Sequence, residues 1–125
     1  MSSSATQKAV YDALKAALAP VKVFDSVPDG TAKPYVSLDA QDVAHDDLLS
    51  EVKYQRRIYL SIWSEYKGQK EVLGIVDAIE AALHSKRLPM DEGRMILATV
   101  ERVRSNLDAD GETYMASVTV KINTE

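Results

Sequence analysis

Tyr54-Gln-Arg-Arg-Ile-Tyr-Leu-Ser-Ile-Trp-Ser64 is the stretch of this sequence that decides the fold. Its side chains alternate between apolar and polar or aromatic with period two, which is the signature of a strand. After Glu65-Tyr-Lys-Gly68 the period changes, and apolar residues recur at spacings of three and four, as on one face of a helix. The strand would present Ile58, Leu60 and Ile62 on one face, and the helix would present Val72, Ile75, Val76, Ile79, Ala82 and Leu83.

Composition limits the classes of protein to which the chain can belong. With 125 residues it can bury about two-thirds of its unfolded surface as one domain, 1–125, without metals or disulfides. It has no cysteine, which excludes a disulfide scaffold, a cysteine nucleophile and thiolate metal sites. Apolar runs are too short to cross a bilayer, and Met1-Ser-Ser-Ser-Ala lacks the pattern of a signal peptide. We therefore expect a protein made in the cytoplasm, with no membrane partner.

The remaining patterns predict an α+β fold. A first helix is expected over Ala5–Ala19, followed by a brief strand at Val21–Phe24. Asp108-Ala-Asp-Gly111 places a glycine where a hairpin needs positive φ, so the last two strands should pair antiparallel. We predict a twisted, mainly antiparallel four-stranded sheet with both helices on one face. Its strands are Pro34–Asp42, Tyr54–Ser64, Arg94–Leu107 and Thr113–Asn123, and its core includes Val10, Leu14, Leu38, Ile58, Leu60, Ile62, Val72, Ile75, Ile79, Val118 and Val120.

Two of these strands carry further expectations. In Pro34–Asp42 alternation places Val36, Leu38 and Ala40 on one face and Asp39 on the other. In Arg94–Leu107 the alternation is irregular, so either both faces of that strand are covered or a bulge shifts its phase.

The segment between the second and third strands of this sheet is acidic. From Asp42 to Glu51 it shows no clean period, which predicts an exposed, mobile loop. His45, together with Asp42, Asp46, Asp47 and Glu51, offers oxygen and nitrogen ligands for a hard cation, but the spacing fits no calcium loop and lacks the glycine needed at its bend. A solvated acidic loop is the favoured interpretation, and we expect no metal or other cofactor.

Catalytic motifs are not found. No serine lies in a Gly-x-Ser-x-Gly elbow, and Gly68 and Gly74, six residues apart, do not form a phosphate loop. His84 is expected at a helix end, where a cation suits the helix dipole. The prediction is that the protein is not an enzyme.

Two further features leave alternatives open. Trp63, on the strand face opposite Ile62, is either covered by a helix of the same chain, which is the favoured interpretation, or forms an aromatic anchor with Tyr59 in an interface. Lys53, Arg56 and Arg57 follow the acidic loop closely. They form either a solvated strand edge or a charge-complementary contact between identical subunits.

Several short segments, in their order and spacing, resemble the tail completion, or tail terminator, family of long-tailed bacteriophages and gene transfer agents. The resemblance covers nearly the whole chain. It is carried by the early helix Ala5–Leu18, the Val27-Pro28 turn, Lys33-Pro-Tyr-Val-Ser-Leu38, Ile58-Tyr-Leu-Ser-Ile-Trp-Ser64, Gly68-x-x-Glu71, Ala81-Ala-Leu83 and Asp108-Ala-Asp-Gly111.

The resemblance implies a virion structural protein that forms a homohexameric ring at the head-proximal end of the tail. Such a ring ends polymerisation of the tail tube and permits head-tail joining, so its partners would be the major tail tube protein and a head connector or stopper. No catalytic residue is implied. By position in the family, the subunit or tail-tube interface would include Asp42, His45, Asp46, Asp47, Glu51, Lys53, Arg56 and Arg57.

Charge is compatible with this role. The chain has 19 acidic and 15 basic residues, a net charge of −4, so it lacks the basic footprint of a tight DNA binder. Six copies at −4 each would carry −24 around a channel through which DNA passes without specific binding. Two alternatives stay open: a head-side connector or stopper, and a small ligand-binding domain in which Trp63, Tyr59 and the acids around His45 line a pocket.

Overall fold

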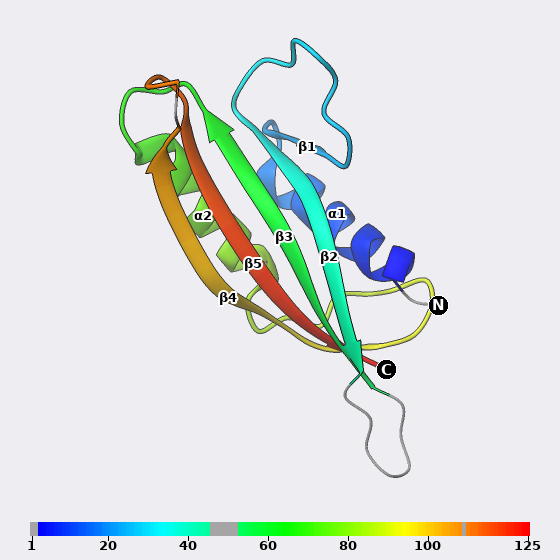
Figure 1. The fold of residues 1–125 in the computed structure, drawn as a ribbon. Helices are drawn as coiled ribbons and strands as arrows, with labels where there is room; N and C mark the ends of the chain where they lie inside the picture. The colour runs from blue at the N-terminus through cyan, green and yellow to red at the C-terminus, as the bar shows by residue number, and fades with distance from the viewer. Residues whose placement is uncertain (1–2, 46–52, 109) are drawn as a thin grey trace.

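The chain folds into a twisted sheet with two helices packed against it (Figure 1). This computed structural model describes residues 3–45, 53–108 and 110–125. The elements, in chain order, are α1 (Ser3–Leu18), β1 (Lys22–Phe24), β2 (Tyr35–His45), β3 (Tyr54–Ser64), α2 (Lys70–Leu83), β4 (Met95–Leu107) and β5 (Tyr114–Thr124).

The sheet has five strands in the order β1-β2-β3-β5-β4. Strand β1 pairs parallel to β2, and every other neighbouring pair is antiparallel. The α+β class and the mainly antiparallel sheet are therefore confirmed. The expected number of four strands is wrong, because the brief strand predicted near Val23 joins the sheet edge through the register Val23 to Val36. A three-residue strand gives too short a pattern for its partner to be read from the sequence.

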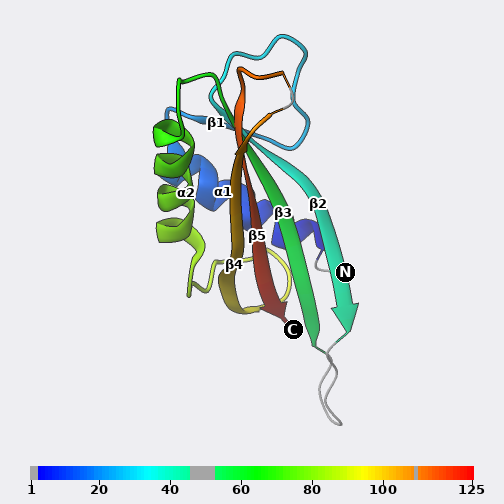
Figure 2. The same cartoon turned by 60° about the vertical axis from the view of Figure 1, so that its left-hand side comes forward.

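Both helices cover the same face of the sheet (Figure 2). Even-numbered side chains of β3 and β5 point to this face, because alternate residues of a strand face opposite ways. Every residue expected in the core is buried, and Val10, Leu14, Ile62, Val72, Ile79 and Val120 are fully so. Within the described ranges, no helix is long and apolar enough to span a membrane.

Strand β2 differs from its prediction in two ways. It continues to His45 instead of ending at Asp42, so the first part of the expected loop is a strand paired with β3. Its register also shifts between Leu38 and Ala40, which leaves Asp39 as the extra residue of a bulge. Beyond the bulge Ala40 is level with Tyr59 and shares its face, contrary to the simple alternation.

Strand β4 has register shifts between Met95 and Leu97 and between Val100 and Arg102. Of the two explanations for its irregular alternation, the bulge is confirmed. A bulge inserts one unpaired residue and so reverses the faces of those that follow. Glu101 is the extra residue at the second shift.

The turn that joins β4 to β5 is the predicted hairpin. Gly111 has φ +75°, and the Asp108 N–H donates to the Thr113 carbonyl. The Asp110 carboxylate accepts from the backbone N–H groups of Glu112 and Thr113 and from the Thr113 hydroxyl. These hydrogen bonds, those from Thr113 first, lower the pKa of Asp110 to about 2.

Candidate assembly surface

The face of the sheet opposite the helices is uncovered among the described residues (Figure 2). It carries the alternate side chains of β3 and β5, which are partly exposed except for Ser61. Trp63 lies here, level with Tyr35 of β2 and Met115 of β5. The expectation that a helix of the same chain covers Trp63 is wrong, because both helices pack on the side of Ile62. Its role as an interface anchor stays a prediction.

Charged side chains on this face pair with one another across strands. Arg57 donates from Nε and Nη2 to the two carboxylate oxygens of Glu101, at 2.9 and 3.1 Å. This fork-to-fork pair raises the pKa of Arg57 and lowers that of Glu101. The Tyr59 hydroxyl donates to Asp42 at 2.7 Å, which raises the pKa of Tyr59. Arg57 and Asp42, both expected at an interface, therefore lie on one exposed surface.

Arg56 is different from its neighbour Arg57, because it points to the helix side and is only 1% exposed. Its guanidinium donates to the Thr124 hydroxyl at 3.0 Å, the Ser3 hydroxyl at 2.7 Å and the Gln41 side-chain oxygen at 3.1 Å. Burial lowers its pKa. The expectation that Arg56 is an exposed interface residue is wrong. Strand alternation places it opposite to Arg57, and it ties the start of α1 to the last strand.

Of the remaining residues expected at an interface, the structure describes Lys53 and His45. Lys53 is half-buried just before β3, and His45 ends β2 with its ring 5.0 Å from that of Tyr54. Asp46, Asp47 and Glu51 lie outside the described residues, so the expected solvated acidic loop around them, and their place at an interface, stay predictions. Among the residues that the structure describes, no group of three or more potential ligands could hold a metal ion.

The alternative of a small ligand-binding domain, in which Trp63, Tyr59 and the acids around His45 line a pocket, stays a prediction, because Asp46, Asp47 and Glu51 lie outside the described residues. Trp63 and Tyr59 lie on the uncovered face. His45 pairs with Tyr54 of β3, and Tyr54 points to the helix side like the other even-numbered residues of β3, so His45 lies on the helix side as well. The three side chains therefore do not surround one cavity.

Two basic residues of the edge strand were not among the residues expected at an interface. Arg102 and Arg104 of β4 are exposed, and neither side chain forms a hydrogen bond or ion pair with the part of the chain that the structure describes. The local sequence Glu101-Arg-Val-Arg104 was the available signal, since alternating charges on a strand mark a solvent-facing or partner-facing edge.

Two of three comparisons with known proteins gave a match, one for the fold and one for the family. A virion structure of a native gene transfer agent (GTA) particle contains a chain with a similar fold, with a TM-score of 0.85 and 22% identity, covering 98% of this chain and 96% of that one. A search of curated protein sequences gave no match. The family model for tail completion protein gp17 matches residues 8–125. The chain therefore belongs to the tail completion protein gp17 family.

Proposed function

We propose that this protein caps the head-proximal end of a tail tube as a homohexameric ring. The protein is a structural protein of a virion tail, because it belongs to the tail completion family over nearly its whole length. That membership is the single observation that carries the proposal. The ring would end polymerisation of the tube and offer its other surface to the head.

The similar chain in the gene transfer agent virion supports the proposal, because it shares the fold from end to end. The architecture is suitable as well. A sheet with two open edges tends to pair with further strands, and a closed ring satisfies both edges without open-ended growth. Partners of the ring would be the major tail tube protein on one side and a head connector or stopper on the other.

We assign no catalytic step to the protein. Two pairs of polar groups on the uncovered face bind each other, Arg57 with Glu101 and Tyr59 with Asp42, and both hydrogen bonds are exposed to water. General acid-base chemistry needs a group whose proton affinity is matched to its task in a site that holds a substrate. These pairs instead suit a surface that meets another protein.

Deletion of the gene from the phage or gene transfer agent that encodes it tests the proposal. Electron microscopy should show tails of abnormal length that have not joined heads, and supplying the protein from a plasmid should restore both properties. Tails of normal length that lack heads would assign the protein to the head-side stopper instead. Normal tails attached to heads would contradict a role in tail completion.

A further inference from the structure

The outer edge of β4 is covered for only half of its length. Near its start, Ala98 exchanges backbone hydrogen bonds with Ser85 and Lys86, both at 2.8 Å, and the Val100 N–H donates to Nδ1 of His84 at 3.1 Å. Beyond Val100, no backbone group outside the sheet pairs with the segment 101–107 among the described residues. We call this segment the basic edge.

The opposite side of the sheet has a matching open segment. Strand β1 pairs with β2 only from Tyr35 to Ser37, so the outer side of 39–44 has no backbone partner in the described chain. We call this segment the acidic edge. Each open segment begins at a bulge, at Asp39 on β2 and at Glu101 on β4. Bulges are common where a sheet edge is shaped for a particular use.

The two edges are complementary in charge and in apolar surface. The basic edge offers Arg102 and Arg104 on the uncovered face, and the acidic edge offers Asp42 on the same face. On the helix side, each edge exposes a valine in its middle: Val103 is 38% exposed and Val43 is 44% exposed. Exposed β-branched residues at the centre of an unpaired strand favour another strand as the partner.

We propose that the basic edge of one copy pairs antiparallel with the acidic edge of the next copy, with Val103 beside Val43. This register places Arg104 beside Asp42 on the uncovered face and Ser105 beside Gln41 on the helix side, so the faces of these paired residues match. The inference deepens the proposed ring, on which it rests, by naming the contact between neighbouring subunits. The contact is head-to-tail, as ring closure requires.

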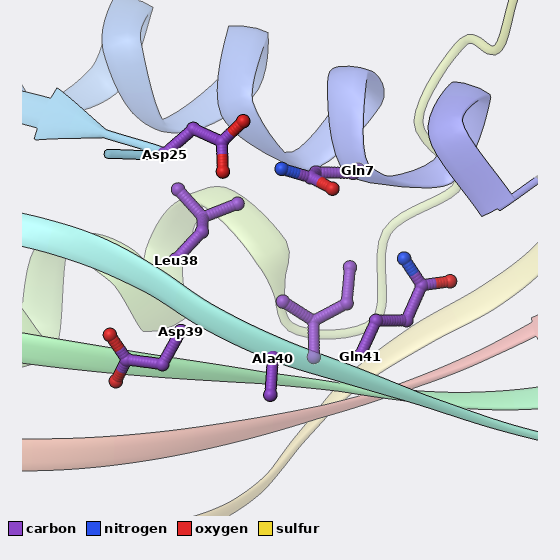
Figure 3. Close-up of a pocket in the computed structure, with 7 residues that line it drawn as sticks. Gln7, Asp25, Leu38, Asp39, Ala40 and Gln41 are labelled. Atoms are coloured by element: carbon purple, nitrogen blue, oxygen red, sulfur yellow. The ribbon is translucent and has the colours of Figure 1, made fainter.

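The pocket beside the acidic edge suits this arrangement (Figure 3). It has a volume of about 90 Å³ and lies on the helix side of β2, between Gln7 of α1, Asp25 and the segment from Leu38 to Gln41. In the proposed register Leu107 of the neighbouring copy is level with Asp39, at this pocket. Leu107 is 47% exposed in the single chain and points to the helix side, because its partner is Tyr114. The pocket would therefore receive an apolar side chain that is otherwise left in water.

The register is also compatible with a closed ring. Within one chain, the residues paired across the four strands β2, β3, β5 and β4 are Asp42, Arg57, Lys121 and Thr99. Between copies, Asp42 would instead pair with Arg104 of the neighbouring copy. Because Glu101 is an extra residue, this shift is four ladder positions, from Lys121 to Ser117 on β5, or about 14 Å along the strands, over a four-strand width of about 19 Å. Strands would then tilt by about 35° to the ring axis, at the lower end of the range of roughly 35–45° found in closed barrels.

Engineered cysteines test the register, because the natural chain contains none. Val43 and Val103 lie on opposite edges of one chain, about 14 Å or more apart, so a disulfide between cysteines at these positions can form only between copies. The variant V43C/V103C should give a ladder of cross-linked species on mild oxidation. The control V43C/L107C moves one cysteine about 13 Å along the same face and should cross-link at least tenfold less.

Both variants are oxidised as concentrated purified protein and in isolated tails. No ladder from V43C/V103C in either sample, or equal ladders from both variants, would overturn the proposed contact. Absence of the protein from tails, with a ladder in the purified sample, would contradict the tail function and leave the contact supported. The two failures are therefore distinguishable.

Charge reversal provides an independent check. In the V43C/V103C background, R104E or D42K should each lower the cross-linked fraction about tenfold or more, because like charges then face each other across the contact. The combination R104E/D42K should restore it. The matched control R87E makes the same charge change at an exposed arginine outside both edges and should have no effect. Loss in R87E equal to that in R104E, or no recovery in the double reversal, would contradict the pairing of Arg104 with Asp42.

Discussion

Replacement of Arg56 by alanine should destabilise the monomer far more than the same change at its neighbour Arg57. Arg56 is 1% exposed and its guanidinium makes three hydrogen bonds, to Thr124, Ser3 and Gln41. Loss of these bonds leaves acceptors unpaired, and loss of the aliphatic stem leaves a cavity, although removal of a desolvated charge offsets part of the cost. We expect a decrease of about 2–4 kcal/mol in the free energy of unfolding, measured by urea denaturation.

Two companion variants separate the causes. R56M keeps most of the stem volume, so it should cost about 1–2 kcal/mol, from the lost hydrogen bonds alone. R57A removes an exposed pair with Glu101 and should cost less than about 1 kcal/mol. Equal losses in R56A and R57A, or a loss below about 1 kcal/mol in R56A, would refute the structural role assigned to Arg56. Charge reversal at Arg56 therefore tests the fold, and assembly should be tested at Arg57 and Arg104.

The remaining predictions concern the core, the hairpin and the edges. I62A and I79A should each lower the free energy of unfolding by about 2–5 kcal/mol, measured by urea denaturation. V43A, at an exposed position, should change it by less than about 0.5 kcal/mol. Equal effects of the core and exposed changes would contradict the assigned core. The pKa of Asp110 is lowered to about 2, so its contribution to stability is complete above the unfolded pKa of about 3.9 and is lost as the pH falls towards 2. D110N should therefore flatten the dependence of the urea midpoint on pH in this window, and an unchanged slope would count against the hydrogen-bonded turn. Hydrogen exchange should show that amides of 39–44 and 101–107 gain protection in assembled tails, while those of β3 change little. Unchanged exchange at both edges would contradict their pairing.

Sequence periodicity predicted the helices, the four long strands and the core, because each of these elements is long enough to repeat its apolar spacing several times. Ile58, Leu60 and Ile62 fix the buried face of β3, and the opposite position of Trp63 follows from that alternation. The coverage of Trp63 could not be decided in this way, because a period specifies two faces but does not say how many of them the helices cover.

The interface residues were harder to predict than the core. Arg56 and Arg57 are adjacent and basic, yet Arg56 is buried and Arg57 is partly exposed, because Arg56 binds the distant partners Ser3 and Thr124. The end of β2 was missed because Asp42 to His45 carries no apolar alternation and is held in the sheet by pairing with β3. Pairing between strands far apart in the chain, and the bulges at Asp39 and Glu101, are tertiary properties that local patterns do not contain.

Reconstruction of intact particles by cryo-electron microscopy tests the central claim most directly. The account predicts six copies of this chain in one closed ring at the head-proximal end of the tail tube, with the strands of neighbouring copies continuous through their edges. A chain found elsewhere in the particle, or present there in a number other than six, would contradict the proposed ring. A six-copy ring whose subunits meet through surfaces other than the acidic and basic edges would keep the function and refute the contact.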